Sequence, residues 1–437
     1  MKKRRKLNVQ KTFCTISASF IIACILFYGF RFVTLYLDNK KSLEAQADTL
    51  AKVITDNNKN DDTFKDINGD YYFSGKVDDN YVMYSNMLWR VVKVNKDNSI
   101  KLVSSDNISY LAFDDEITSF NDSYISKWLN TDVLTNQLDK NAITYNPICT
   151  DNITETNNKE CENYNNELNF GLLSVAEYVN AGGEESYLNN EKFFYLSSIK
   201  DDEVWYVTSR GKLKSSSGDK LYGVRPTITL KANTIYTSGK GTSEDPYQVS
   251  SDTLFASFVE LGDETWRVYE VNGDTIKLSL NDYLKVDNTE FSHIYSNDNY
   301  YHNDTTYGSL AFYLNQTYIN DLSYQNNLLE TNWSNGLLSS NYDYKDCLDT
   351  TVNSKIAMLS IGNIILNDNL NNYFLMSGNS ENEDMVYEIK ENGSMSEISV
   401  SSEAYVVPTI AISKDLLTKG KGTSNEPYEV EWKYEKK

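Results

Sequence analysis

The sequence predicts an α+β fold: an N-terminal transmembrane helix followed by two homologous, mostly antiparallel sheet modules, each with one or two helices. Three observations predict it. An uncharged apolar run lies near the start of the chain, a long internal duplication follows it, and strand patterns outnumber helix patterns without β-α-β alternation. The predicted parts are a cytoplasmic basic tail (1–11), the transmembrane helix (12–37), a juxtamembrane stalk or linker (38–66), module 1 (67–250), module 2 (251–433) and a short tail (434–437).

The first 41 residues are basic in an otherwise acidic chain. The 437 residues include 41 Lys and Arg and 62 Asp and Glu, a net charge of -21, yet residues 1–41 hold nine basic residues and one acidic residue. The uncharged run Thr12–Phe30 continues apolar past Arg31 to Leu37, long enough to cross about 30 Å of hydrocarbon. By the positive-inside rule, we expect a signal anchor in the cell membrane, a single span with the N-terminus cytoplasmic and the bulk extracellular.

Two other interpretations of this segment stay open. Ala45 and Ala47 form a small-residue cleavage site like that of a signal peptide, although it lies beyond several charged residues. The sequence Ile21–Cys24 fits a lipoprotein cleavage box in which Cys24 becomes acylated, although the following residues stay apolar.

The stalk begins with a helical pattern. Leu43, Ala47, Leu50 and Ile54 are spaced four, three and four residues apart, which is typical of one helix face. Such a face forms a juxtamembrane stalk or pairs two chains as a homodimer through residues 43–54. The polar stretch 56–70 that follows is typical of a solvated linker.

An internal duplication accounts for most of the chain after residue 66. WRV at 89–91 recurs at 266–268, and GKGTSEDPY at 239–247 recurs as GKGTSNEPY at 420–428. Shorter matches lie between them: SKWLN with AFYLN, FYLS with FLMS (Phe194–Ser197 with Phe374–Ser377), and PTI with PTI. The repeat framework consists of Trp89, Arg90, Trp128, Arg225 and Pro226 in module 1 and of Trp266, Arg267 and Pro408 in module 2.

Local patterns predict the elements of module 1 in order. Residues 89–94 and 99–103 alternate apolar and polar side chains around a polar turn, which predicts a hairpin. One helix is expected at Ser123–Leu134, and another begins at Ser174, where Glu177 completes a capping box, and stops at Gly182. The closing strands are expected at Phe193–Ser197, Val204–Ser209 and Val224–Leu230.

Cysteine spacing predicts one disulfide. Cys149 and Cys161 flank a polar loop and are 12 residues apart, which suits a loop-closing bridge worth about 3 kcal/mol. Cys347 is the counterpart of Cys161 in module 2 and lacks a partner there. A metal-binding cysteine pair lacks nearby His and C-x-x-C spacing, so we expect no metal site.

Catalytic and cofactor motifs do not occur in the sequence. Its two histidines, His293 and His302, lie in a polar loop, and no nucleophile-elbow, zinc-protease, dinucleotide-binding or P-loop string is present. We therefore expect no catalytic residue and no cofactor. A pI near 4.6 also argues against a nucleic-acid partner, because such proteins present a basic face.

Two residue types leave a choice between binding and structure. Arg90 and Arg267 follow a Trp inside a strand, where a guanidinium either faces a ligand as a fork or pins a core strand; we favour the second. Tyrosines either form a sugar-stacking platform or cover sheet faces. The tyrosines in question are Tyr71, Tyr72, Tyr81, Tyr84 and Tyr301.

The strings WRVVKV, SKWLN and YGVRPTITL resemble the signature of an uncharacterised domain family found on membrane-anchored surface proteins of Gram-positive and related bacteria. Module 2 is a weaker copy, since Tyr313 replaces Trp128 and Val407 replaces Arg225. The family is distantly similar to C-type-lectin-like and sulfatase-modifying-factor-like scaffolds. This resemblance implies ligand binding on loops over a small sheet.

The expected function is therefore non-enzymatic: adhesion, envelope interaction or binding of an extracellular ligand, either a glycan or a protein. Two alternatives remain. An extracytoplasmic hydrolase of glycans or cell wall would carry two carboxylates facing one concave site. A structural spacer would bind nothing.

Overall fold

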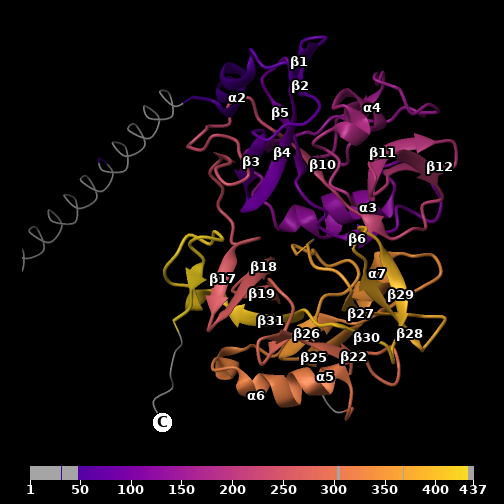
Figure 1. Cartoon of the computed structure of the whole chain (residues 1–437), viewed down its shortest axis with the longest axis vertical. Helices are drawn as coiled ribbons and strands as arrows, with labels where there is room; N and C mark the ends of the chain where they lie inside the picture. The colour runs from indigo at the N-terminus through magenta and orange to yellow at the C-terminus, as the bar shows by residue number, and fades with distance from the viewer. Residues whose placement is uncertain (1–30, 32–47, 303–305, 368, 432–437) are drawn as a thin grey trace, which may run out of the picture. The chain divides into compact units, whose positions relative to one another are not determined.

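The computed structural model of the protein describes Arg31 and residues 48–302, 306–367 and 369–431. Residues Leu50–Lys437 form one compact unit, in which four sheets of five to nine strands carry most of the structure (Figure 1). Strands account for 35% of the chain and helices for 14%. The predicted α+β class is therefore wrong. The fold is mostly β, because the helices are too short to build a layer of their own.

The first sheet of module 1 is built on the predicted hairpin. β4 (Met87–Val94) and β5 (Ile100–Ser104) pair antiparallel. On the other side of β4, β3 (Tyr81–Tyr84) pairs with its first half and β2 (Asp70–Phe73) with its second half. The remaining strands are β15 (Thr227–Leu230) and β10 (Phe170–Gly171) beyond β5, β7 (Ile143–Thr144) beside β15, β1 (Phe64–Ile67) beside β2, and β16 (Tyr247–Gln248) parallel to β3.

The second sheet of module 1 has the order β13-β12-β11-β14-β6. β11 (Phe194–Lys200) and β12 (Glu203–Val207) are two of the predicted closing strands, and β11 runs parallel to β14. The other members are β13 (Leu213–Ser216), β14 (Tyr222–Gly223) and β6 (Tyr110–Leu111), and a separate pair is formed by β8 (Ile148–Cys149) and β9 (Tyr164–Asn165).

Module 2 repeats the strand order of both sheets. The order β32-β17-β18-β19-β31-β26 corresponds to β16-β3-β4-β5-β15-β10, and β29-β28-β27-β30-β22 corresponds to β13-β12-β11-β14-β6. The parallel contacts of β17 with β32 and of β27 with β30 recur as well. The bounds are β17 (Phe258–Leu261), β18 (Glu264–Asn272), β19 (Thr275–Leu280), β22 (Ser292–Ile294), β26 (Ile356–Met358), β27 (Tyr373–Asn379), β28 (Met385–Ile389), β29 (Met395–Ser399), β30 (Glu403–Tyr405), β31 (Pro408–Ser413) and β32 (Tyr428–Glu429).

The modules differ in two hairpins. Module 1 has the β1–β2 hairpin, whose tight turn is formed by Asn68 and Gly69, both with positive φ. In module 2, the hairpin of β20 (Lys285–Val286) and β21 (Thr289–Glu290) lies between β19 and β22 instead. Additional short strands of module 2 are β23 (Thr331–Ser334), β24 (Leu337–Leu338) and β25 (Thr351–Ser354).

Short helices connect the sheets. The predicted helix at 123–134 begins as expected at the Ser123 cap, but only α3 (Tyr124–Lys127) is α-helical, and Trp128–Asp132 continues as a π-helix. The predicted capping box of Ser174 and Glu177 is confirmed in α4 (Val175–Asn180). The other helical segments are α2 (Leu50–Asn58), α5 (Leu310–Phe312), a π-helix at Tyr313–Tyr318, α6 (Ile319–Asp321), α7 (Tyr344–Asp349) and 3-10 turns at Leu134–Asn136, Gly183–Glu185, Gln325–Asn327 and Lys414–Leu416.

Equivalent strands show that one predicted alignment is shifted by a residue. Ser198 Oγ accepts a hydrogen bond from Val175 N at 3.0 Å, and Ser377 Oγ accepts one from Ile361 N at 2.9 Å. Ser198 is therefore the counterpart of Ser377, whereas matching FYLS with FLMS pairs Ser197 with it. A one-residue slip exchanges the two faces of a strand. An alignment based on the identical residues of FYLS and FLMS therefore pairs positions on one face of a strand with positions on the opposite face of its counterpart.

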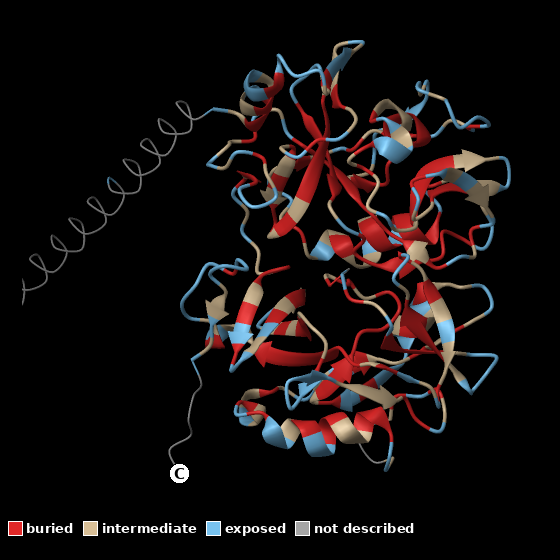
Figure 2. Ribbon diagram, viewed as in Figure 1, coloured by how far each residue is buried: buried red, intermediate tan, exposed pale blue. Residues whose placement is uncertain are grey.

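The hydrophobic core runs through both modules. One cluster of buried side chains extends from Leu50 in α2 to Leu416 near the end of the chain, with Trp89, Trp128 and Trp266 fully buried in it. Figure 2 shows this burial along the central strands of the sheets, while the helix over α5 and α6 presents exposed and intermediate residues on its outer side. The two modules are therefore packed as one body.

The predictions that concern the membrane need correction. In the parts of the chain that the structure describes, no helix is long and apolar enough to cross a bilayer. The predicted transmembrane helix, the single-span membrane partner and the cell-membrane location are contradicted by this finding. Apart from Arg31, the segment 12–37 lies outside the described residues.

The prediction of a stalk at 38–66 also needs correction for the residues that the structure describes. α2 belongs to the folded unit: Leu50 and Ile54 are fully buried in the core, and Leu50 N donates to Thr234 O at 2.8 Å. A homodimer through residues 43–54 would use Leu50 and Ile54 in its interface. Their burial within the chain argues against pairing at these two positions, and the homodimer stays a prediction. Residues 43–47 lie outside the described residues.

A polar crevice as the candidate functional site

The tryptophans and prolines of the repeat framework are structural. Trp89 Nε1 donates to Tyr84 O at 3.0 Å, and Trp128 Nε1 donates to Gly362 O of module 2 at 2.7 Å. Pro226 O accepts from Ser104 N, and Pro408 opens β31 opposite Met358. A proline at a strand start gives up no ladder hydrogen bond, which explains its place there.

The framework arginines hold backbone carbonyls inside the core. Arg90 donates to Asn80 Oδ1, to Val77 O and to Tyr81 Oη, and its guanidinium lies 3.8 Å from the Tyr81 ring centroid. Arg267 donates to Leu366 O and Ala256 O. Arg225 donates to Ser104 O and Leu188 O, and burial lowers the pKa of both Arg225 and Arg267 to about 10. These contacts show that the arginines hold core strands in place and do not face a ligand.

The tyrosines proposed as a platform do not form an exposed one. Tyr72, Tyr84 and Tyr301 are buried, and Tyr301 Oη donates to Ile356 O at 3.0 Å. Tyr81 lies under the Arg90 guanidinium. These tyrosines cover sheet faces and form polar contacts inside the modules.

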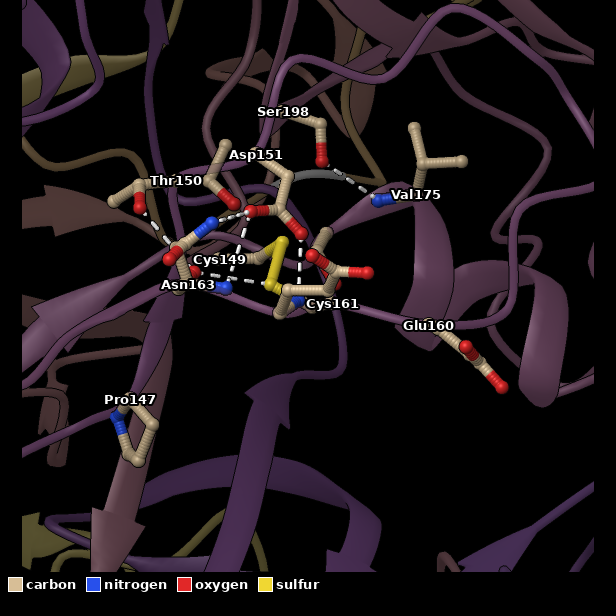
Figure 3. Close-up of a disulfide and its surroundings, with 12 residues drawn as sticks. Pro147, Cys149, Thr150, Asp151, Glu160, Cys161, Asn163, Val175 and Ser198 are labelled. Carbon is tan, nitrogen blue, oxygen red and sulfur yellow. Dashed lines mark hydrogen bonds between the residues drawn. A yellow bond between two sulfur atoms is a disulfide. The ribbon is translucent and has the colours of Figure 1, made fainter.

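The structure joins Cys149 to Cys161 (Figure 3). The sulfurs are 2.08 Å apart and the Cα atoms 5.9 Å apart, within the ordinary range for a disulfide. Beside the bridge, Asp151 accepts hydrogen bonds from Glu162 N and from both the N and Nδ2 atoms of Asn163. Both sulfurs and this carboxylate therefore have partners within the loop. Cys347 is free and buried, and burial raises its pKa to about 12.

The two histidines do not face a nucleophile among the described residues. His302 Nε2 lies 2.9 Å from Asp298 Oδ1 on a partly exposed loop. His293 stacks on Tyr313 with ring centroids 5.6 Å apart. Both positions are those of surface side chains.

A network of buried charges crosses the first sheet of module 1. Lys101 Nζ lies 2.6 Å from Glu177 Oε1 and donates to Pro147 O at 2.9 Å. Lys93 Nζ lies 2.9 Å from Asp70 Oδ2 and 5.2 Å from the Tyr72 ring centroid. Asp70 and Tyr72 belong to β2, so the β1–β2 hairpin provides the partners of Lys93 in this network.

The same place in module 2 is open. Glu270 and Lys277 are the counterparts of Lys93 and Lys101, and Lys277 Nζ lies 3.1 Å from Glu270 Oε2. β17 pairs only with residues 264–267 of β18, and among the described residues no strand equivalent to β2 lies beside residues 268–272. Val271 N donates instead to Gln137 Oε1 of module 1 at 2.8 Å. The missing hairpin leaves a crevice.

This crevice has a volume of about 500 Å³ and is lined by both modules. Module 1 contributes the segment Asp132–Gln137 that follows the α3 helix, and module 2 contributes β18, β19, β23 and the loop at 362–364. Most of the lining is polar. The polar side chains are Asp132, Asn136, Gln137, Glu270, Asn272, Lys277, Asn332, Ser334, Thr351 and Asn363.

Comparison with known protein families, with characterised proteins and with solved structures gives no match. The resemblance to a bacterial surface-domain family therefore stays a prediction, and the crevice must be interpreted from its own chemistry.

The charges of the crevice are paired. Asp132 Oδ2 accepts from Tyr344 Oη at 2.5 Å and lies 3.0 Å from Lys345 Nζ, while Glu270 is paired with Lys277. Lys277 also lies 5.3 Å from the Trp333 ring centroid. Each carboxylate thus lies beside a lysine, which holds it in position.

A larger hollow of about 690 Å³ lies within the disulfide-closed loop, but its whole lining comes from residues 151–162 of that loop. No second element contributes to the lining of this hollow, so we take the crevice as the site. Sequence reasoning missed the crevice residues. The repeat alignment carries a usable signal, because it places Glu270 opposite Lys93, a reversal of charge at an otherwise similar strand position.

Proposed function

We propose that the protein is a non-enzymatic binding protein whose crevice takes a polar, hydroxyl-rich ligand such as an oligosaccharide. The observation that carries the proposal is the set of amide side chains that line the crevice with free hydrogen-bonding capacity. Within the described residues, the Asn272 side chain and the Nδ2 atoms of Asn332 and Asn363 form no hydrogen bond to the protein. Amides both donate and accept, which matches the mixed requirement of sugar hydroxyls.

The paired charges of the crevice support the same function. An ion pair such as Glu270–Lys277 offers a fixed acceptor and a fixed donor at its rim without a net charge. A strongly charged ligand would be repelled by the member of the pair that has the same charge, whereas a neutral polyol can form hydrogen bonds with both. The chemistry therefore favours a neutral, hydroxylated ligand over an anionic polymer.

The proposal is tested by applying the full chain to an array of glycans and comparing it with two variants. Asn272→Ala/Asn332→Ala removes the Asn272 amide and the Nδ2 donor of Asn332, each worth about 0.5–1.5 kcal/mol, so we expect roughly tenfold weaker binding. Asn425→Ala changes an exposed amide on a distant loop and should bind as the wild type does. Absence of binding to any glycan, or equal binding by the two variants, would reject the proposal.

A glycan hydrolase is the second candidate, because Asp132 and Glu270 both line the crevice. We favour binding, because each carboxylate has a lysine partner, whereas the general acid of a glycosidase sits where its protonated form is favoured. The array ligands should therefore be recovered intact. If the protein released new reducing ends, and Asp132→Asn and Glu270→Gln each abolished this release, the proposed function would change from binding to hydrolysis.

A further inference from the structure

The contact between the modules uses the edge of the second sheet of module 2. β29 is the last strand of that sheet, and module 1 closes it: Met395 N donates to Leu221 O at 3.0 Å, and Tyr222 forms an antiparallel bridge with Ser394. Next to this bridge, Phe193 N donates to Asn392 O at 2.8 Å. A short extended segment of module 1 thus continues the sheet of module 2.

Module 1 contains the same edge. β13 is the counterpart of β29, as the turns before them show: Thr208 N donates to Lys212 O, and Lys390 N donates to Ser394 O. Leu213 is therefore the counterpart of Met395. Met395, whose N–H donates to Leu221 O of module 1, is buried, whereas Leu213 is only half-buried. Among the described strands, β13 pairs with β12 alone.

A groove lies beside this open edge. It has a volume of about 430 Å³, and its lining includes Tyr178, Val179, Gly182, Glu184 and Leu213. Its position corresponds to the surface of module 2 that module 1 covers, because Val179 is the counterpart of Ile365, whose N–H donates to Ile108 O of module 1. Module 1 therefore retains an uncovered version of an interface that the chain uses once already.

A second copy of the chain does not suit this edge. To dock as module 1 docks on module 2, it would have to present the face around Tyr313, the counterpart of Trp128. That face is occupied within the chain: the Tyr313 ring stacks on Phe291 with centroids 4.5 Å apart, and the β20–β21 hairpin, which module 1 lacks, leads into Phe291. The β20–β21 hairpin therefore covers the face of module 2 that a second copy would need, as a capping element covers the last repeat of a repeat protein.

The charge at the open edge indicates the chemistry of its partner. Arg210, Lys212 and Lys214 follow one another at alternate positions, are exposed, and have no ion-pair partner among the described residues. Exposed lysines on an edge strand discourage pairing with a neutral or basic strand. They favour an acidic strand. Among the described residues that line the groove, Glu184 is the one acidic side chain.

We propose that β13 and the adjoining groove bind an extended, acidic segment of a partner protein, which joins the sheet as an added strand and places an apolar or aromatic side chain beside Leu213. Backbone hydrogen bonds supply affinity in this mode, and the side chains supply selectivity. The internal contact of Leu221 and Tyr222 with β29 is its template within the chain.

The test uses a fluorescent peptide based on residues 217–224 with Lys220→Glu, of sequence SGDELYGV, and the full chain. Lys212→Glu/Lys214→Glu should weaken binding at least tenfold at low salt, and so should Leu213→Asp, whose melting curve must match the wild type. The matched control, Lys419→Glu/Lys421→Glu, makes the same change of charge on exposed loop residues of module 2 and should have no effect.

A basic peptide with Asp219→Lys, SGKKLYGV, should bind at least tenfold more weakly than the acidic peptide. Equal binding of the two peptides, no binding of the acidic peptide at about 1 mM, or no effect of Lys212→Glu/Lys214→Glu would overturn the proposal. Analytical sedimentation of the full chain measures whether it self-associates. Self-association of the full chain that Leu213→Asp abolishes would identify a second copy as the occupant and would equally overturn it.

Discussion

Asn130 and Asn315 make the same three hydrogen bonds in the two modules. Asn130 Nδ2 donates to Ser126 O and Phe170 O, and its Oδ1 accepts from Phe170 N at 3.0 Å. Asn315 Nδ2 donates to Ala311 O and Ile356 O, and its Oδ1 accepts from Ile356 N at 3.0 Å. Each asparagine therefore ties the π-helical turn to the edge strand β10 or β26, which explains why this turn deviates from α-helix in both modules.

Replacing either asparagine should destabilise the fold. Asn130→Ala leaves the buried backbone N–H and C=O of residue 170 without partners. Asn315→Ala leaves the N–H of residue 356 without a partner, while Ile356 O keeps the hydrogen bond from Tyr301 Oη. We expect each variant to lose about 1–3 kcal/mol in urea unfolding. Asn425→Ala, at an exposed loop, should change stability by less than about 0.5 kcal/mol. Unchanged midpoints for both core variants would show that water replaces these bonds.

The repeat was predictable because it rests on residues that build strands and turns. The hairpin of β4 and β5 alternates apolar and polar residues over much of its length, with a break at Val91–Val92, where its register shifts. The capping box at Ser174 needs only two residues at fixed spacing. The β1–β2 hairpin carries a signal too: Asn68-Gly69 is a favoured two-residue turn, which the interpretation of 56–70 as a solvated linker overlooks.

The crevice was not predictable in the same way. It exists because no strand accompanies the second half of β18 and because Gln137, more than 130 residues earlier in the chain, bonds to Val271 instead. Such long-range pairing leaves no local pattern. The same holds for α2, whose apolar face is typical of a stalk in sequence but is buried against the sheets in the structure.

Trp128 and Tyr313 form a matched pair for the contact between the modules. Trp128→Phe deletes the bond from Nε1 to Gly362 O in a fully buried position, so we expect a loss of about 1–3 kcal/mol and a single unfolding transition. Tyr313→Phe keeps the half-buried ring stack and removes only a hydroxyl, so its effect should stay within about 0.5 kcal/mol. Tryptophan fluorescence during denaturation measures both. Equal effects of the two substitutions would contradict the structural difference between these equivalent positions.

Lys101 and Glu177 should be more costly to separate than to remove together. Burial opposes ionisation of Glu177, but Lys101 and Lys93 outweigh it and hold the pKa of the carboxyl below its ordinary value. Lys101→Met leaves that carboxylate buried without its nearest cation, so we expect a loss of about 3–5 kcal/mol.

Adding Glu177→Gln to Lys101→Met removes the unpaired charge and keeps an acceptor for the Ser174 cap, so part of the stability should return. A double variant no more stable than Lys101→Met would show that packing of the lysine, rather than the charge pair, matters. Circular dichroism during thermal unfolding provides the comparison, with Lys419→Met as the exposed control.

Asp114 should make the fold less stable as the pH rises. Burial, followed by its contact with Asp115, raises the pKa of Asp114 to about 6, against about 3.9 in the unfolded chain. Between these values the native state holds a proton that the unfolded state has lost. The free energy of unfolding therefore falls from about pH 4 to about pH 6 and stays lower above that range.

Asp114→Asn removes this penalty and retains an oxygen that accepts from Asp115 N, as Asp114 Oδ1 does at 2.9 Å. We expect the variant to exceed the wild type by about 1 kcal/mol at pH 7 and to equal it at pH 4, because the wild-type side chain is then neutral in the native state. The control is Asp122→Asn, at an exposed position two residues before α3. Urea unfolding at both pH values decides the matter: a variant that is equally stabilised at pH 4 and pH 7 would mean that the gain comes from packing rather than from the proton.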